Sequence, residues 1–171
     1  MEKEKTIEVL NTLITVNNDR IKGYETASKE TDNQDLKTLF VQFKATSQQC
    51  KQELVTEINK LGGKIAEGTI TSGEFFCMWM EVLEAALTGS DRRTILKSCE
   101  YGEDAAVDTY FRALRNNMNN ITAEQQIMIN GQHNLIRADY NKMKSMRDAL
   151  AYTQIKYDIP LTQSTAEHSW F

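Results

Sequence analysis

The chain has 171 residues, of which 40% are hydrophobic and 26% are charged, and its formal net charge is −4. These values fit a single globular or bundle domain rather than a disordered chain. The mild, mixed charge gives no sign of a nucleic-acid partner, and the longest apolar run, FFCMWM, is too short to cross a bilayer, so no membrane association is expected.

The cysteines indicate neither zinc binding nor dithiol chemistry. Cys50, Cys77 and Cys99 are widely spaced, and no CxxC pair is present. An axial offset of about 10 Å between Cys50 and Cys99 argues against a disulfide, so both are expected to be small buried side chains. The first residues, MEKEKTIEVL, lack the apolar segment of a secretory signal. Together with reduced cysteines, this predicts a cytoplasmic protein.

Helical periodicity dominates the first half of the chain. One pattern covers residues 4–30 and a second covers residues 32–61, after the turn sequence TDNQD. Gly62 and Gly63 end the second helix, because glycine adopts the left-handed conformation that follows a helix. A short helix, SGEFFCMWMEVLEAALTG, comes next, with Thr71 or Ser72 as its cap.

Two further long helices are predicted in the second half of the chain, over residues 91–118 and 122–152. The latter opens with a capping box formed by Thr122 and Gln125. We expect residues 1–152 to form the bundle and residues 153–171 to form an extended tail. Its apolar residues either dock on the bundle or a neighbour or remain unpacked: Tyr157, Ile159, Leu161, Trp170 and Phe171.

The connections between these helices predict their directions. Two connections are only a few residues long, which favours two antiparallel hairpins. Residues 62–90 are instead long enough to cross a bundle of about 40 Å, so the third long helix is expected to run parallel to the second. The predicted fold is all-α: a four-helix bundle of two hairpins with a long crossover that carries a short fifth helix.

The apolar stripes become polar near the middle of all four long helices. Heptad spacing places Asn17, Ser47, Cys50 and Glu103 inside, and on the last helix it places His133 and Tyr140 inside, with Arg137 beside them. Buried polar groups cost about 1–3 kcal/mol each when unpaired. We therefore expect a mutually bonded polar layer, in which Arg137 neutralises Glu103. A catalytic or ligand-binding role for this pair is the alternative.

Several stretches resemble the ferritin-like superfamily, and most closely an uncharacterised bacterial branch, a domain of unknown function sometimes linked to stress responses. They are NDRIKGYETAS, LKTLFVQF, INKLGG, YGEDAAVDTYFRAL and ADYNKMKSMRD. The resemblance implies a di-iron layer with one glutamate each from helices one and three and a Glu-x-x-His motif each from helices two and four. Here Asn17 replaces the first glutamate, Ser47 and Cys50 replace one motif, and Arg137 and Tyr140 replace the other, whereas Glu103 remains. The resemblance thus implies a bundle that has lost its di-iron ligands and binds no cofactor.

Three functions remain open on these grounds. The leading hypothesis is a non-catalytic structural or interaction bundle, not an enzyme, with an unknown protein partner. A stress setting is implied by the resemblance alone. A metal-binding or redox protein would use Glu103 and His133 as residual ligands with Cys50 and Tyr140, although such a histidine is more often a core residue. A small-molecule carrier would have its pocket at the polar layer. A homodimer is expected through apolar residues of the crossover helix: Phe75, Phe76, Trp79 and Leu83.

Overall fold

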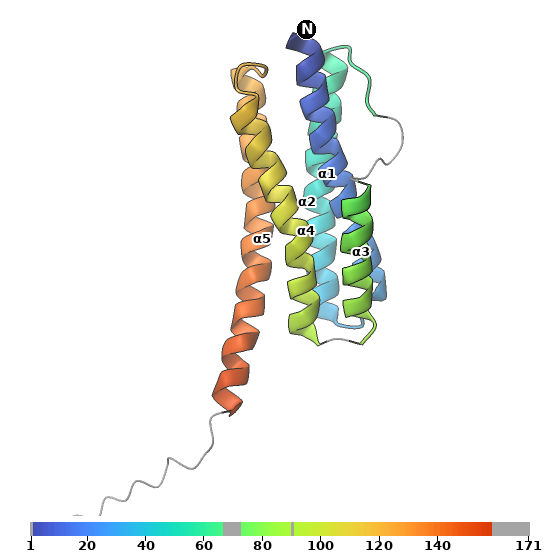
Figure 1. Cartoon of the computed structure of the whole chain (residues 1–171), viewed down its shortest axis with the longest axis vertical. Helices are drawn as coiled ribbons and strands as arrows, with labels where there is room; N and C mark the ends of the chain where they lie inside the picture. The colour runs from blue at the N-terminus through green and yellow to red at the C-terminus, as the bar shows by residue number, and fades with distance from the viewer. Residues whose placement is uncertain (1, 67–72, 90, 159–171) are drawn as a thin grey trace, which may run out of the picture.

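The computed structural model describes residues 2–66, 73–89 and 91–158, which form five helices and no strands (Figure 1). The all-α prediction is confirmed over these residues. The last helix ends at Asp158 rather than at residue 152, and the predicted caps Thr71 and Ser72 and the tail from residue 159 lie outside the described residues. The helices are α1 (Glu2–Glu30), α2 (Gln34–Lys60), α3 (Glu74–Leu87), α4 (Arg92–Asn116) and α5 (Ala123–Asp158).

The long helices pair as two antiparallel hairpins. The contacts are most extensive between α1 and α2 and between α4 and α5. Figure 1 shows α2 and α4 beginning at the same end of the molecule, so these two helices run parallel, as the long crossover predicts. Among the described helices, none combines the length and the apolar composition needed to span a membrane.

Local sequence signals set the helix ends. The Asn33 side chain accepts the backbone N–H groups of Asp35 and Leu36, which have no partner inside the helix, and so caps α2. Gly62 has a φ of +67°, the left-handed conformation expected after a helix. At the start of α5, the Thr122 hydroxyl accepts the N–H of Gln125 at 3.1 Å, and the Gln125 side chain accepts the N–H of Thr122 at 2.9 Å. The predicted capping box is therefore confirmed.

Two apolar cores fill the bundle, and a polar layer lies between them. The core toward the N-terminus of α1 contains Leu10, Leu13, Leu54, Ile58, Tyr110 and Ile129 among its buried residues. The core toward the other end contains Tyr24, Phe40, Phe43, Trp79, Leu96 and Met143. Each of the four long helices contributes side chains to both cores.

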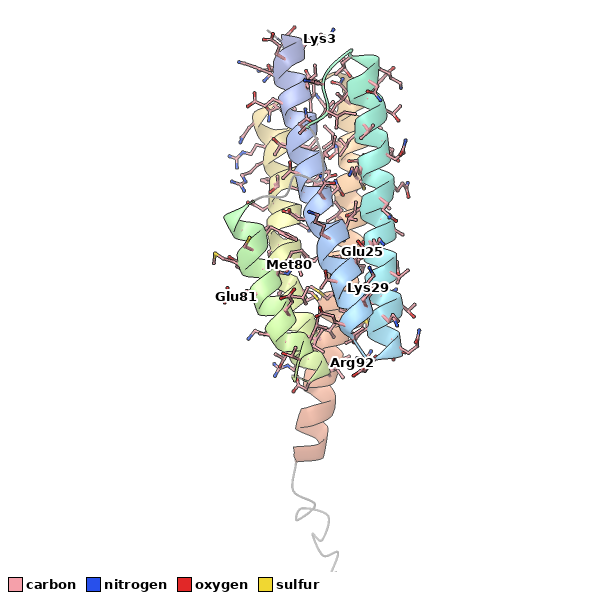
Figure 2. The ribbon with its side chains drawn as sticks, turned by 90° about the vertical axis from the view of Figure 1, so that its right-hand side faces the viewer. Lys3, Glu25, Lys29, Met80, Glu81 and Arg92 are labelled. Carbon is pink, nitrogen blue, oxygen red and sulfur yellow. The ribbon has the colours of Figure 1, made fainter. Side chains whose placement is uncertain are left out.

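The short helix α3 covers one side of the bundle and only the half that is distant from the N-terminus (Figure 2). Trp79 anchors it, with its indole ring between α1 and α4 and its Nε1 donating to the Ser98 carbonyl oxygen at 3.2 Å. Only glycine leaves room for this ring: a Cβ at Gly23 or Gly102 would lie 2.4 Å or 2.3 Å from indole atoms. The two glycines thus form the slot that receives Trp79.

This burial corrects two residues of the predicted dimer surface. Trp79 and Leu83 lie in the core and present no surface to a partner. The physical reason is that α3 is amphipathic and turns its Trp79 face toward α1 and α4. Phe75 and Phe76 are half-buried against the same core.

Candidate functional site

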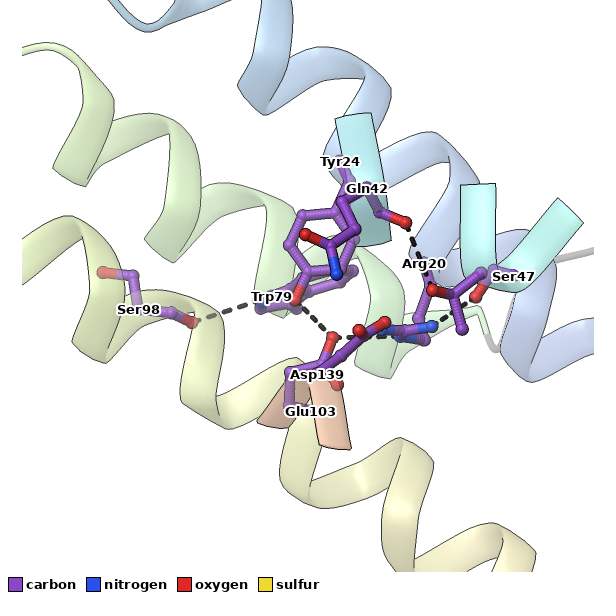
Figure 3. Close-up of polar contacts among 9 residues, drawn as sticks. Arg20, Tyr24, Gln42, Ser47, Trp79, Ser98, Glu103 and Asp139 are labelled. Atoms are coloured by element: carbon purple, nitrogen blue, oxygen red, sulfur yellow. Dashed lines mark hydrogen bonds and ion pairs between the residues drawn. The ribbon is translucent and has the colours of Figure 1, made fainter. Parts of the chain in front are cut away.

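Arg20 of α1 lies at the centre of the polar layer and is 1% exposed. Its guanidinium binds side chains from the three other long helices (Figure 3). Nε donates to Oε1 of Glu103 at 2.9 Å, Nη1 donates to Oγ of Ser47 at 2.6 Å, and Nη2 donates to Oδ2 of Asp139 at 3.1 Å. One planar cation therefore connects α1 with α2, α4 and α5.

Glu103 is the carboxylate at the core of this cluster. Its Oε1 accepts hydrogen bonds from both Arg20 and the Tyr24 hydroxyl. Its Oε2 is buried and has no hydrogen-bond partner among the described residues. Asp139 is also buried, so one guanidinium pairs with two carboxyl groups that are almost fully shielded from solvent.

Burial and charge oppose each other at these groups. Burial lowers the pKa of the Arg20 guanidinium, but the negative charge of Glu103 and the groups of Tyr24 and Asp139 outweigh it, so this pKa is raised and Arg20 stays charged. Burial raises the pKa of the Glu103 carboxyl above its ordinary value, and the charge of Arg20 and the hydrogen bonds from Tyr24 and Arg20 offset only part of this rise. The ion pair with Arg20 offsets the free-energy cost of burying the Glu103 carboxylate at this depth.

A second set of hydrogen bonds lies next to the arginine cluster, toward the N-terminal core. Nδ2 of Asn17 donates to the Tyr110 hydroxyl at 2.7 Å, and this hydroxyl donates to Oε1 of Gln132 at 2.8 Å. Nε2 of Gln132 then donates to Oε2 of Glu53 at 2.9 Å and to the Cys50 carbonyl oxygen at 3.1 Å. This chain of bonds satisfies polar groups from all four long helices.

Four of the predicted layer residues lie where the sequence places them. Asn17, Ser47, Cys50 and Glu103 are all fully buried at the centre of the bundle. Burial raises the pKa of the Cys50 thiol to about 12, so this side chain is neutral at pH 7 and acts as a small buried group. Cys99 is likewise buried and free.

The prediction for Arg137 is wrong, because this side chain is exposed and the cation beside Glu103 is Arg20. Tyr140 and His133 are only half-buried; the Tyr140 hydroxyl contacts Glu100, and the His133 ring stacks on Tyr110 at 6.5 Å.

The error follows from the phase of α5. Its inward side chains follow the series Gln125, Ile129, Gln132, Ile136, Asp139 and Met143, whereas the predicted series takes positions 133 and 140 instead of 132 and 139. A one-residue shift rotates a position by about 100° around a helix, which moves Arg137 away from the seam. Arg20 was missed for a related reason: α1 contacts α2, α3 and α4, so its buried face is wider than one stripe. The sequence did contain a signal for Arg20, since this residue lies about one helical turn after Asn17, which was expected inside.

The structure does not assemble the residual metal site. Glu103 binds Arg20 and Tyr24 inside the layer, while His133 lines a groove on the outer side of α4 and α5. Over the described residues, no group of three or more His, Cys, Asp and Glu side chains is placed to hold an ion.

A cavity of about 180 Å³ lies beside Arg20 between α1, α3 and α4, and it is smaller than the roughly 300–1,000 Å³ of typical ligand sites.

Comparison with known protein families identifies the family of this chain. No curated protein matches the chain. A family model described as a domain of unknown function, DUF2383, matches residues 5–116, from the start of α1 to the end of α4. Because this match covers more than half of the 171 residues, the chain belongs to the DUF2383 family of domains of unknown function.

Proposed function

We propose that the protein is a non-catalytic bundle of the ferritin-like type that works through protein contacts and uses Arg20 where a metal centre would lie. The observation that carries this proposal is the guanidinium of Arg20 bonded to Glu103, Ser47 and Asp139 at mid-bundle. A fixed organic cation in this position supplies the positive charge that buried carboxylates need.

The ferritin-like assignment rests on connectivity and on the polar layer. Two hairpins with one long crossover, and one inward polar residue from each long helix at the same depth, are the features of that superfamily. The residues present do not fit two metal ions. Glu103 and Asp139, the two carboxylates of the layer, both bond to Arg20, and no histidine from the described residues joins them. We therefore derive no chemistry through a metal.

Metal retention tests this proposal directly. The purified protein is incubated with Fe²⁺, Mn²⁺ or Zn²⁺, desalted and analysed for bound metal. We expect far less than one ion per chain, and the same value in Glu103→Gln. Stoichiometric metal in the wild type that is lost in Glu103→Gln would overturn the proposal and favour the metal or redox alternative.

Exposed apolar side chains on α3 and α4 supply a candidate contact surface. Met78 and Val82 of α3 are 55% and 49% exposed, and Tyr101 of α4, beside them, is 45% exposed. We propose that a second copy of the chain binds here, on the outer face of α3, instead of through Trp79 and Leu83. The stress-related setting stays a proposal that rests on the bacterial resemblance alone.

Sedimentation equilibrium tests this surface. We expect the wild-type mass to be that of a dimer and the double variant Met78→Ser/Val82→Ser to be a monomer. Ile127→Ser is the matched control, because Ile127 is exposed on α5, outside this surface, and should leave the dimer intact. A monomeric wild type would refute the proposed contact.

A further inference from the structure

A groove runs along the outer side of the α4–α5 hairpin, near the end of α4 and the start of α5. Its volume is about 460 Å³, within the range of small-molecule sites. Six of its lining residues matter for the argument, and we call their surface the α4–α5 groove: Phe111, Leu114, Arg115, Met118, His133 and Arg137.

One part of the groove is apolar. Phe111 and Met118 are 50% and 60% exposed, and Leu114 between them is half-buried against the N-terminal core. Phe111 and Leu114 come from the last turns of α4, and Met118 from the turn that follows this helix. Large apolar side chains gathered around a concave surface indicate a binding site more than scattered ones do.

The other part of the groove is cationic and unpaired. Arg115 from α4 and Arg137 from α5 both line it, and neither has a salt bridge or hydrogen bond to another described residue. Several other arginines of the bundle have carboxylate partners, such as Asp108 for Arg112 and Asp35 for Arg92. Two unpaired guanidinium groups on one concavity favour an anionic occupant.

His133 adds a polar atom that lacks a partner. The His133 side chain lines the groove between the two helices, and its Nε2 is buried without a hydrogen-bond partner among the described residues. A buried polar atom without a partner is costly, and a ligand group that bonds to Nε2 after the ring turns toward the groove would remove this cost.

We infer that the α4–α5 groove binds a small amphipathic anion, a carboxylate with an apolar chain, whose head group lies between Arg115 and Arg137 and whose chain covers Phe111, Leu114 and Met118. A second copy of this chain is the less suitable occupant. A two-fold contact centred on the groove would bring the unpaired arginines of both copies together, and like charges in a contact are unfavourable. This site is separate from the Arg20 layer and from the outer face of α3.

Calorimetric titration of the full chain with octanoate at pH 7.5 tests this inference, with 1-octanol as the neutral probe of the same chain length. We expect one octanoate to bind per chain, with an affinity that falls as salt is added. The affinity of 1-octanol should be at least about 10-fold lower.

Two double variants separate the groove from general charge. Arg115→Gln/Arg137→Gln should weaken octanoate binding at least about 10-fold, since two charge-assisted contacts are lost. Arg93→Gln/Arg112→Gln removes the same charge from exposed positions of α4 outside the groove and should leave the affinity unchanged. Phe111→Ser should weaken octanoate and 1-octanol alike.

Three outcomes would overturn the inference. They are no octanoate binding at millimolar concentration, equal affinity in both double variants, and a dimer in solution that Phe111→Ser converts to monomers. The last result would identify a second copy as the occupant. The test is independent of the metal and dimer experiments above, because none of their variants lines the groove.

Discussion

Arg20 shows how much a single residue decides in this bundle. Its guanidinium makes three hydrogen bonds to three helices and also lies over the rings of Tyr24 and Phe43, at 5.6 Å and 5.9 Å from their centroids. A cation at this depth is stable only because its partners are carboxylates, and the carboxylates are stable only because of the cation.

Replacing Arg20 with methionine should therefore lower the free energy of unfolding by about 3–5 kcal/mol, because Glu103 and Asp139 would remain buried without a counter-charge. Urea denaturation at pH 7 measures this. Arg112→Met is the control: Arg112 is exposed and pairs with Asp108, so its replacement should change the free energy by less than about 0.5 kcal/mol. Equal losses in the two variants would show that the buried cluster has no special role in stability.

His133 provides a test of local electrostatics. Burial, and then the charge of Arg137, lower the pKa of His133 below its ordinary value of about 6.5. The folded state thus favours the neutral ring. The contribution of His133 to the free energy of unfolding is therefore complete above pH 6.5 and is lost as the pH falls through the pKa of the folded state. A proton NMR titration should give a pKa below 6.5 that rises in Arg137→Gln and stays the same in Arg93→Gln.

The sequence indicated that a polar layer exists, but not which of its side chains bond to one another. Ser47 and Glu103 could be placed because α2 and α4 carry unambiguous stripes, and Asn17 because it continues the apolar stripe of α1. The partner of Glu103 could not, because Arg20 and Arg137 both stand near the middle of a helix. Only the packing of α1 against three other helices decides in favour of Arg20.

At the scale of the helices, the contact between α3 and the bundle depends on two residues without side chains. Gly102→Ala should lower the free energy of unfolding by about 1–3 kcal/mol, because the new Cβ overlaps the Trp79 ring. Thermal or urea unfolding gives the value. Gly131→Ala is the matched control in α5: a Cβ there meets no atom within 4 Å, so higher helix propensity should stabilise the protein by up to about 1 kcal/mol.

A double-mutant cycle tests whether overlap with the Trp79 ring causes this loss of stability. In a Trp79→Leu background, Gly102→Ala should cost clearly less than in the wild type, because the colliding ring is gone. An unchanged cost would show that backbone effects, and not the slot, explain the glycine.

Helix positions could be predicted because capping residues and periodicity are local. The buried faces of α2 and α4 were predicted correctly for the same reason. In α5, Ile129, Ile136 and Met143 fit two different stripes, and every intervening candidate is polar or aromatic: Gln132, His133, Asp139 and Tyr140. Periodicity alone could not choose between these stripes, since the choice depends on which side chains find partners across the bundle.

The whole molecule should unfold as one unit although a polar layer divides its apolar interior. All four long helices pass through both cores, so neither core can open without loosening helices of the other. Leu13→Ala in one core and Leu96→Ala in the other should each cost about 2–5 kcal/mol. In a Trp170→Phe background, circular dichroism and the fluorescence of Trp79 should give the same midpoint for each variant; separate midpoints would reveal two independent halves.

The Arg20 cluster also bears on how the molecule reaches its final state in a cell. A bundle that closes around bound ions needs a loading step, and its assembly depends on the supply of those ions. Here the central counter-ion is the side chain of Arg20, so each chain contains one such cation as soon as it is synthesised. The charge balance of this cluster is therefore written in the sequence, because the cation that pairs with Glu103 and Asp139 is part of the same chain.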